Sequence, residues 1–354
     1  MNDIAAHDAI VVGAGQSGLA AARALQSRGL EPIVLEAGGE PVGSWPNYYD
    51  SLTLFSPARY SGLPGVTFSG DPEHYPTREE VVAYLRGYAK QLDADIRTTT
   101  RVAAMRYRDG VHTVATDNGS ELTAELVIAA TGGFGRPFIP TLPGRDDFTG
   151  QVMHAGHYRE PSAFAGQRVV VVGAGNSAVQ IAVELAGTAD VTLATRNPVK
   201  YVPQRPFGKD MHFWLTVTGI DTVPVGPWLR HPPTAPVFDT GIYRGAVRSG
   251  RPGRRPMFTH LHDDTVVWAD GSHEHVDTVL MATGYNPDMD YLRPIGALDA
   301  TGVPQHRHGL STTHPGLGYV GLEWQRSLSS ASLRGVGRDA AHVVNALLAK
   351  RTRP

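Results

Sequence analysis

The chain has 354 residues, of which 41% are hydrophobic and 19% are charged, and its formal net charge is −2. These values are typical of a globular protein large enough for two domains, and they favour neither a nucleic acid nor a membrane surface as a partner. The sequence has no cysteine, no metal-ligand spacing, and no targeting or membrane-spanning segment; this excludes disulfides and thiolate chemistry and predicts a cytoplasmic protein without a metal.

The first predicted unit, over residues 9–36, is a strand, a glycine turn, a helix and a second strand. The apolar run AIVV is typical of a buried parallel strand, and SGLAAARALQSRG has helical spacing. The turn between them has the G-x-G-x-x-G spacing of a dinucleotide site, in which the helix N-terminus faces a pyrophosphate. The turn comprises Gly13, Gly15, Gln16, Ser17 and Gly18.

The second strand of this unit ends in an acid, Glu36, about 20 residues beyond the first glycine. A carboxylate at this position accepts hydrogen bonds from an adenosine ribose and repels a 2′-phosphate. The unit therefore predicts a dinucleotide without that phosphate. A glycine turn that serves packing alone is the alternative.

The next elements are a loop, a helix and a meander. A loop rich in Pro, Gly and Tyr fills residues 38–76, and TREEVVAYLRGYAKQL then predicts a helix that begins with a capping box of Thr77 and Glu80. Residues 97–125 alternate between apolar and polar side chains and contain DG and NG pairs, which predicts an antiparallel meander. ELVIAATG predicts one more buried strand.

The strand–turn–helix–strand pattern starts again at residue 168 with RVVVVG, a helix over 177–187, and VTLATR. Arg196 stands where the first unit has its acid, and a guanidinium matches a 2′-phosphate bidentately. The second unit thus predicts NADPH; NADH as donor and an ordinary solvated arginine are the alternatives. The turn comprises Gly173, Gly175, Asn176, Ser177 and Ala178.

The remaining chain completes both units. Residues 198–262 show no regular pattern, VDTVLMATG and LGYVG predict buried strands, and ASLRGVGRDAAHVVNALLAK predicts a closing helix. We expect an α/β fold with two Rossmann-like domains, one inserted in the other. The FAD-binding domain comprises 1–155 and 295–354, and the NAD(P)H-binding domain comprises 160–290, including the irregular segment.

Two different dinucleotides on one chain predict an FAD that receives hydride from a nicotinamide cofactor. In disulfide reductases a protein cystine takes the electrons onward, and a chain without cysteine has no such outlet. Oxygen, a quinone or another protein must therefore accept them.

The segment between the two units, FTGQVMHAGHYR, identifies a family. It matches F-x-G-x-x-x-H-x-x-x-Y/F-K/R, the fingerprint of the flavin-containing monooxygenases, and the sequence here resembles the class B flavin monooxygenases. The motifs GSW, YPTREEVVAYL, ATGGFGRPFIPTLPG and ATGYNPD extend the resemblance along the whole chain. SLTLFSPARYSGLPG and SSASLRGVG are similar to small bacterial flavin monooxygenases and, within them, to proteins encoded with arsenic-resistance genes. The matching residues are Phe148, Gly150, His154, Tyr158 and Arg159.

The resemblance implies an NADPH-dependent FAD monooxygenase. Such an enzyme passes one oxygen atom from O2, through a C4a-(hydro)peroxyflavin, to a soft nucleophile such as a sulfide, an amine or a trivalent arsenical, with some Baeyer–Villiger oxygenation of ketones. The partners are then O2 and a small substrate, and a homodimer is left open. Two rival functions remain: an NAD(P)H reductase for a quinone or a protein, and a flavin redox sensor that is not an enzyme.

The resemblance also implies further site residues. Candidates for the catalytic region are Phe55, which replaces the Asn of S-L-x-x-N-x-P and lies either beside the isoalloxazine or in the core, and His154, which orders the linker or titrates. The insert RPFGKDMHFWLTVTG is expected to roof the substrate channel. Further FAD-binding candidates are Trp45, Val102, Thr131, Gly132, Ser330, Ala331 and Leu333.

Overall fold

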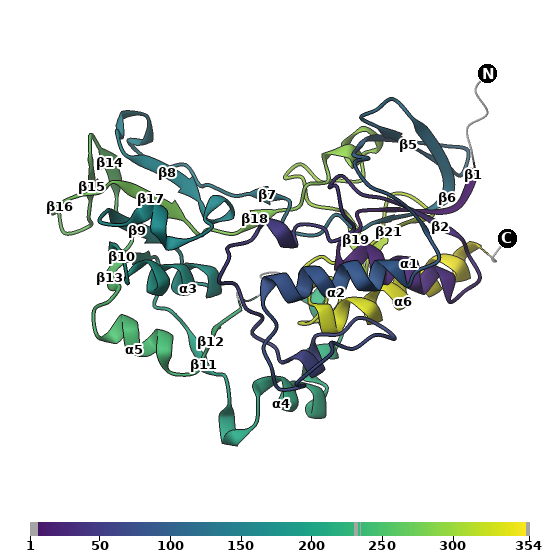
Figure 1. The fold of residues 1–354 in the computed structure, drawn as a ribbon. Helices are drawn as coiled ribbons and strands as arrows, with labels where there is room; N and C mark the ends of the chain where they lie inside the picture. The colour runs from purple at the N-terminus through teal and green to yellow at the C-terminus, as the bar shows by residue number, and fades with distance from the viewer. Residues whose placement is uncertain (1–5, 230–232, 234, 352–354) are drawn as a thin grey trace.

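The computed structural model describes residues 6–229, 233 and 235–351. The prediction that the N-terminus carries no targeting signal falls partly on residues 1–5, which lie outside the described residues. The chain forms two lobes, each built on its own parallel sheet (Figure 1). In Figure 1 the first lobe lies to the right and the second to the left. The short ribbon of β7 (Arg136–Pro137) and β18 (Tyr285–Asn286) lies between them.

The first lobe has a parallel sheet in the order β21-β6-β1-β2-β3, with β20 and β19 added at one edge. Alternate residues of the strands face opposite sides, so Val11 and Ile128 pack with helices while Ile10 and Val127 pack against the meander. The strands are β1 (Ala6–Val12), β2 (Pro32–Leu35), β3 (Asp95–Arg97), β4 (Val102–Arg108), β5 (Val111–Thr116), β6 (Glu121–Ala129), β19 (His306–Arg307), β20 (Leu310–Ser311) and β21 (Leu317–Tyr319). The helices are α1 (Gln16–Gln26), α2 (Arg78–Lys90) and α6 (Leu333–Arg351).

The second lobe has an entirely parallel sheet in the order β13-β10-β9-β17-β8. Helices cover one face, and a small antiparallel sheet of β14, β15 and β16 packs on the other through residues such as Trp268. The strands are β8 (Gln151–His154), β9 (Arg168–Val172), β10 (Asp190–Thr195), β13 (Gly253–Pro256), β14 (His260–His262), β15 (Thr265–Val267), β16 (His273–His275) and β17 (Thr278–Met281). The helices are α3 (Asn176–Leu185) and α5 (Ile242–Arg248).

The two lobes therefore repeat one plan, a parallel sheet with helices on one face and antiparallel strands on the other. This confirms the α/β fold with two dinucleotide-binding domains. The chain enters the second sheet at β8 and leaves it after β17, whereas the domain boundaries at 155, 160, 290 and 295 stay a prediction.

Two expectations about local structure were incomplete. The meander and the strand ELVIAATG are not separate, because β6 runs unbroken from Glu121 to Ala129 and pairs with β5 on one side and β1 further along. The segment 198–262 is also not irregular throughout. It contains β11 (Tyr201–Pro203), α4 (Met211–Thr218), β12 (Val237–Asp239), α5, β13 and β14. These elements are too short to show a clear periodicity in the sequence.

Short 3₁₀ helices mark the connections, at Trp45–Asn47, Ala58–Tyr60, Arg145–Asp147, Ala155–His157, Pro161–Phe164, Pro206–Gly208, Ile220–Thr222, Gly226–Trp228 and Asp290–Ile295. Within the described residues, none of the helices combines the length and the apolar character needed to cross a bilayer.

The fold predicts opposite effects for two glycine-to-alanine changes. A Cβ at Gly18 would lie 1.7 Å from the carbonyl oxygen of Gly13, so Gly18→Ala should lower the free energy of unfolding by about 1–3 kcal/mol or more. Gly87, inside α2, has open space around it among the described residues. Gly87→Ala should therefore raise that free energy by up to about 1 kcal/mol. Urea unfolding of both variants tests the pair, and equal shifts would contradict the tight packing at the first turn.

Candidate functional site

The first glycine turn joins β1 to α1, and its backbone packs directly against the backbone of neighbouring segments. Gly13 has a φ of +100°, and a Cβ on it would lie 2.8 Å from the carbonyl oxygen of Ala130. Gly15 faces Gly43 of the GSW motif, where a Cβ would lie 2.7 Å from the Cα of Gly15. Glycine is therefore required at Gly43, whose φ is +59°, and the backbone of the turn stays bare.

The helices that follow the two glycine turns begin without a side-chain cap. The N-cap residues of α1 and α3 are Gly15 and Gly175, and neither supplies an acceptor. In contrast, α2 has the predicted capping box of Thr77 and Glu80. The first N–H groups of α1 and α3 are thus left for an anion, and a dinucleotide pyrophosphate fits both positions.

Glu36 is buried directly beside the first turn. Its Oε2 accepts a hydrogen bond from the N–H of Ala14 at 2.6 Å, and its Oε1 accepts one from the N–H of Gly38 at 2.7 Å. Each carboxylate oxygen can accept a second hydrogen bond, so a ribose hydroxyl fits the same group. Glu36 therefore holds the turn closed, and its role in binding a ribose and repelling a 2′-phosphate stays a prediction.

Gln16 connects three segments of the expected FAD site. Its Nε2 donates to the carbonyl oxygen of Ala331 at 2.6 Å, and its Oε1 accepts from the indole N–H of Trp45 at 3.0 Å. The start of α1, the GSW motif and the segment before α6 therefore meet at one side chain.

The other expected FAD residues have different surroundings. Ser17 and Ser330 are buried, and the Ser330 hydroxyl accepts from the N–H groups of Arg326 and Ser327. Thr131 and Gly132 follow β6, while Val102 begins β4 on the sheet face opposite α1. Leu333 is the first residue of α6, so this helix begins two residues later than expected, and Leu333 packs in the core.

The second glycine turn repeats the geometry of the first. Gly173 has a φ of +146°, and a Cβ on it would lie 2.5 Å from the carbonyl oxygen of Ala282 and 2.9 Å from the Cβ of Ala178. No described atom comes within 4 Å of a Cβ placed on Gly175. Ser177 is exposed, whereas the amide of Asn176 binds the carbonyl oxygen of Pro236 and the N–H of Phe238. Asn176 thus joins the turn to β12.

Arg196 follows β10 and is exposed, and its guanidinium has no partner among the residues that the structure describes. Arg254 donates to the Thr195 hydroxyl at 3.0 Å, next to it in the chain. Burial raises the pKa of Tyr201 and Asp239 adds to this, while Arg254 and Arg244 oppose it. Arg244 and Arg254 lie in the segment 198–262, which shows no regular pattern in the sequence, so neither was predicted as a site residue. Arg196 and Arg254 together fit an anionic group at the end of β10.

The linker fingerprint has a structural reason at each position. A Cβ on Gly150 would lie 2.5 Å from the Phe148 ring, so only glycine fits there. His154 is buried at the end of β8. Its Nδ1 accepts from the N–H of Gly156, and its Nε2 donates to the carbonyl oxygen of Gly284. Burial lowers the pKa of His154 below its usual range. A neutral His154 therefore orders the linker, and a catalytic role for it stays a prediction.

The last two fingerprint residues tie the lobes together. The Tyr158 hydroxyl donates to Glu184 of α3 at 2.8 Å, and Arg159 donates to the carbonyl oxygen of Tyr48 at 2.8 Å. Tyr49 in turn donates to Gln180 of α3. The loop after the GSW motif is thus fastened to the second lobe beside the linker.

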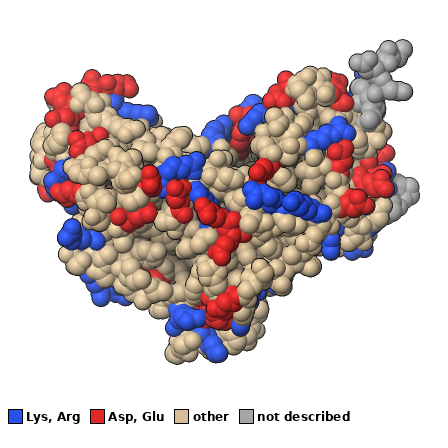
Figure 2. Space-filling view, viewed as in Figure 1, with Lys and Arg blue, Asp and Glu red and all other residues tan. Residues whose placement is uncertain are grey.

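Phe55 is not a core residue, because 39% of its side chain is exposed. Its ring stacks on Phe238 with centroids 5.2 Å apart and on His212 with centroids 5.9 Å apart. Phe238 belongs to β12 of the second lobe and Phe55 to a loop of the first lobe, so the stack spans both lobes. Figure 2 shows that the surface is hollowed between the lobes. The position of Phe55 beside the isoalloxazine stays a prediction.

Comparison with known proteins gives one consistent result. The pattern of the pyridine nucleotide-disulphide oxidoreductase family matches residues 10–214. An uncharacterized oxidoreductase CzcO-like of Geobacillus kaustophilus is 34% identical, over 96% of this chain and 98% of its own. Indole-3-pyruvate monooxygenase YUCCA1 of Oryza sativa is 32% identical, over 82% of this chain and 80% of its own. The solved flavin-containing monooxygenase from Stenotrophomonas maltophilia superposes with a TM-score of 0.86 at 28% identity, covering 99% and 100% of the two chains. The similarity to proteins encoded with arsenic-resistance genes stays a prediction.

The buried His154 predicts a pH dependence of stability. Because its pKa is lower in the folded chain than the usual 6.5, the unfolded chain binds the proton first as the pH falls. The free energy of unfolding should thus decrease below pH 6.5, with His154 contributing at most about 1.4 kcal/mol per pH unit. In His154→Gln this decrease should be smaller, as measured by urea unfolding at pH 7.5 and at pH 5.5. His262→Gln, at an exposed position, is the control, and identical slopes in all three proteins would refute the assignment.

Proposed function

The chain belongs to the pyridine nucleotide-disulphide oxidoreductase family and, within it, to the class B flavin monooxygenases, and on this basis we propose that it uses FAD and NADPH to oxygenate a soft nucleophile such as a sulfide or an amine. The protein is thus a flavin-dependent monooxygenase. The identity of both cofactors and the class of substrate are the proposed part. A trivalent arsenical and a ketone are the alternative substrates.

The proposed reaction consumes NADPH, a proton and O2 for each substrate molecule. One oxygen atom enters the sulfide or amine, and the other leaves as water, while NADPH becomes NADP⁺. A bound flavin supplies the redox chemistry between the nicotinamide and O2. Since the chain has no cysteine, no protein dithiol takes part in the electron transfer.

The observation that supports two different dinucleotides is the opposite charge at two otherwise matching turns. Glu36, fixed by two backbone N–H groups, would accept the ribose of FAD, and the bare N-terminus of α1 would bind its pyrophosphate. The bare N-terminus of α3 would bind the second pyrophosphate, and Arg196 with Arg254 would bind a 2′-phosphate. This division of charge favours NADPH over NADH as the donor.

The oxygen atom can be followed directly to test the proposed function. The holoenzyme is incubated with NADPH, ¹⁸O₂ and methyl phenyl sulfide, and the product is analysed by mass spectrometry. We expect one ¹⁸O atom in the sulfoxide and a yield that rises with the NADPH consumed. A reductase would consume NADPH and return unlabelled sulfide, with faster turnover on an added quinone. A redox sensor would turn over neither NADPH nor the sulfide.

The proposed phosphate contact predicts a change in nucleotide preference. Arg196→Ala should raise the KM for NADPH about tenfold or more, because a charge-assisted contact to phosphate contributes more than about 1.4 kcal/mol. The KM for NADH should change less than about twofold, since it lacks the phosphate. Arg97→Ala, which removes an exposed arginine on β3, is the control. Equal changes in both KM values for Arg196→Ala would remove the case for this contact.

A further inference from the structure

The insert between β11 and β12 leaves the second lobe and is anchored on the first. In Figure 1 its helix α4 lies near α6, away from the sheet of the second lobe. The carboxylate of Asp221 pairs with Arg334 of α6 at 2.8 Å, and its carbonyl oxygen accepts from the N–H and the hydroxyl of Ser329. The N–H of Gly226 donates to the carbonyl oxygen of Arg326. The part of the insert that the structure describes is therefore held on the first lobe by α6 and the segment before it.

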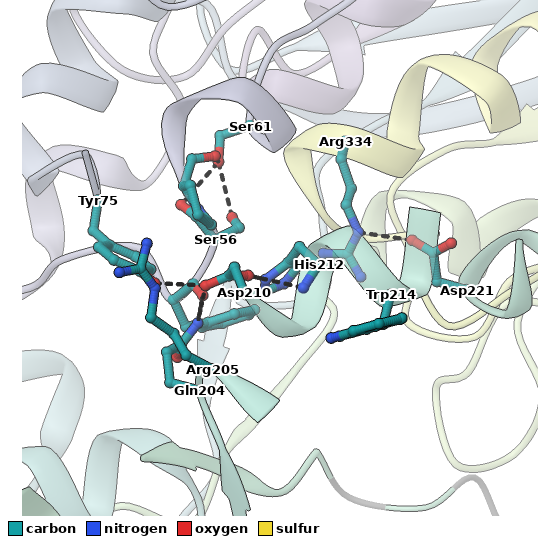
Figure 3. Close-up of polar contacts among 12 residues, drawn as sticks. Ser56, Ser61, Tyr75, Gln204, Arg205, Asp210, His212, Trp214, Asp221 and Arg334 are labelled. Atoms are coloured by element: carbon teal, nitrogen blue, oxygen red, sulfur yellow. Dashed lines mark hydrogen bonds and ion pairs between the residues drawn. The ribbon is translucent and has the colours of Figure 1, made fainter. Parts of the chain in front are cut away.

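Asp210, the N-cap residue of α4, is the centre of a buried hydrogen-bond network (Figure 3). Its carboxylate accepts from the backbone N–H and the Nδ1 of His212, both at 2.8 Å, from Gln204 at 2.7 Å, and from the hydroxyl of Tyr75. Burial alone would raise the pKa of Asp210, but these hydrogen bonds lower it to about 2. Asp210 is thus a fixed negative charge, and Tyr75 connects it to the first lobe.

His212 is fully buried and oriented by this carboxylate. Its ring lies 5.9 Å from Phe55, 5.5 Å from Phe238 and 6.3 Å from Tyr60, measured between centroids. The interplanar angles to these three rings are 25°, 34° and 29°. A hydrogen bond through Nδ1 fixes the plane of an imidazole that could otherwise rotate. The oriented ring of His212 therefore packs against all three neighbouring rings.

We infer that Asp210 and His212 form a positioning pair that holds Phe55 and Phe238 as an aromatic wall of the substrate site, and that this wall selects nucleophiles carried on a flat aryl group. The inference rests on the proposed function. Phe55 and Phe238 lie almost parallel, at 10°, and Phe55 leaves 39% of its side chain free for another ring. Aromatic rings prefer such offset stacking, and a fixed wall loses less entropy on binding than a mobile one.

Two substitutions each remove one of the two features of His212 that the inference requires, its ring and its hydrogen bond to Asp210. His212→Asn keeps a donor for Asp210 but removes the ring, and His212→Phe keeps a ring but removes the donor. In both we expect the KM for methyl phenyl sulfide to rise about tenfold, with kcat and the KM for dimethyl sulfide within about twofold. A substitution that only loosened the fold would change the KM values for both sulfides alike. His262→Asn, at an exposed position, should change none of these values.

A binding measurement makes the test independent of turnover. Methyl phenyl sulfone has no free electron pair on sulfur and is not oxygenated, so its Kd for the oxidised holoenzyme can be measured by calorimetry. We expect this Kd to rise about tenfold in both His212 variants. Phe55→Leu, at a partly exposed position, should show the same loss even if a His212 variant does not fold.

The outcomes distinguish the two proposals. A wild-type protein that binds the sulfone, with weaker binding in the variants, but forms no sulfoxide would refute the proposed function and leave the aromatic wall standing. Normal sulfoxide formation with equal effects on both sulfides would overturn the wall alone. A wild-type protein that does not bind the sulfone would also overturn it.

Discussion

The structure depends on two places where a strand, a turn and a helix approach so closely that no side chain fits between them. At Gly13 and Gly173 a Cβ would lie 2.8 Å and 2.5 Å from a carbonyl oxygen of the neighbouring strand segment. This approach brings the bare N-termini of α1 and α3 to the carboxyl edges of their sheets, where open α/β sheets bind ligands. Everything specific to each cofactor is then added by side chains beside a common backbone.

Much of the fold could be predicted because its signals are local. The glycine spacings, the capping box of α2 and the apolar run of β9 each lie within a few residues of one another, and the structure has all three. The insert could not be predicted in the same way. Its helix α4 and the turn that follows are fixed by contacts to Tyr75 and Arg334, which are more than 100 residues away in the chain. For the same reason Arg254, on β13, went unrecognised as a neighbour of β10.

The linker fingerprint illustrates how a family motif can be structural. Its glycine makes room for an aromatic ring, its histidine binds two backbone groups, and its last two residues connect the loop after Trp45 to α3. None of these contacts requires a reacting atom. The motif therefore sets how the two lobes sit against each other, and the aromatic stack of Phe55 and Phe238, which spans the lobes, is a consequence of that placement.

Glu36 and Arg196, the residues proposed to distinguish the two dinucleotides, differ in how many contacts they make with the rest of the described chain. Glu36 closes the first turn through Ala14 and Gly38, so a replacement without an acceptor oxygen also deprives the buried amide of Ala14 of its partner. Arg196 has no such duty among the described residues and can be exchanged without disturbing its surroundings. Under the proposed assignment, the contact to FAD is therefore tied to the integrity of the fold, whereas the contact to the nicotinamide cofactor depends on an exposed side chain. On this proposal, replacing one exposed side chain would be enough to exchange the electron donor, whereas exchanging the prosthetic group would require the first turn to be rebuilt.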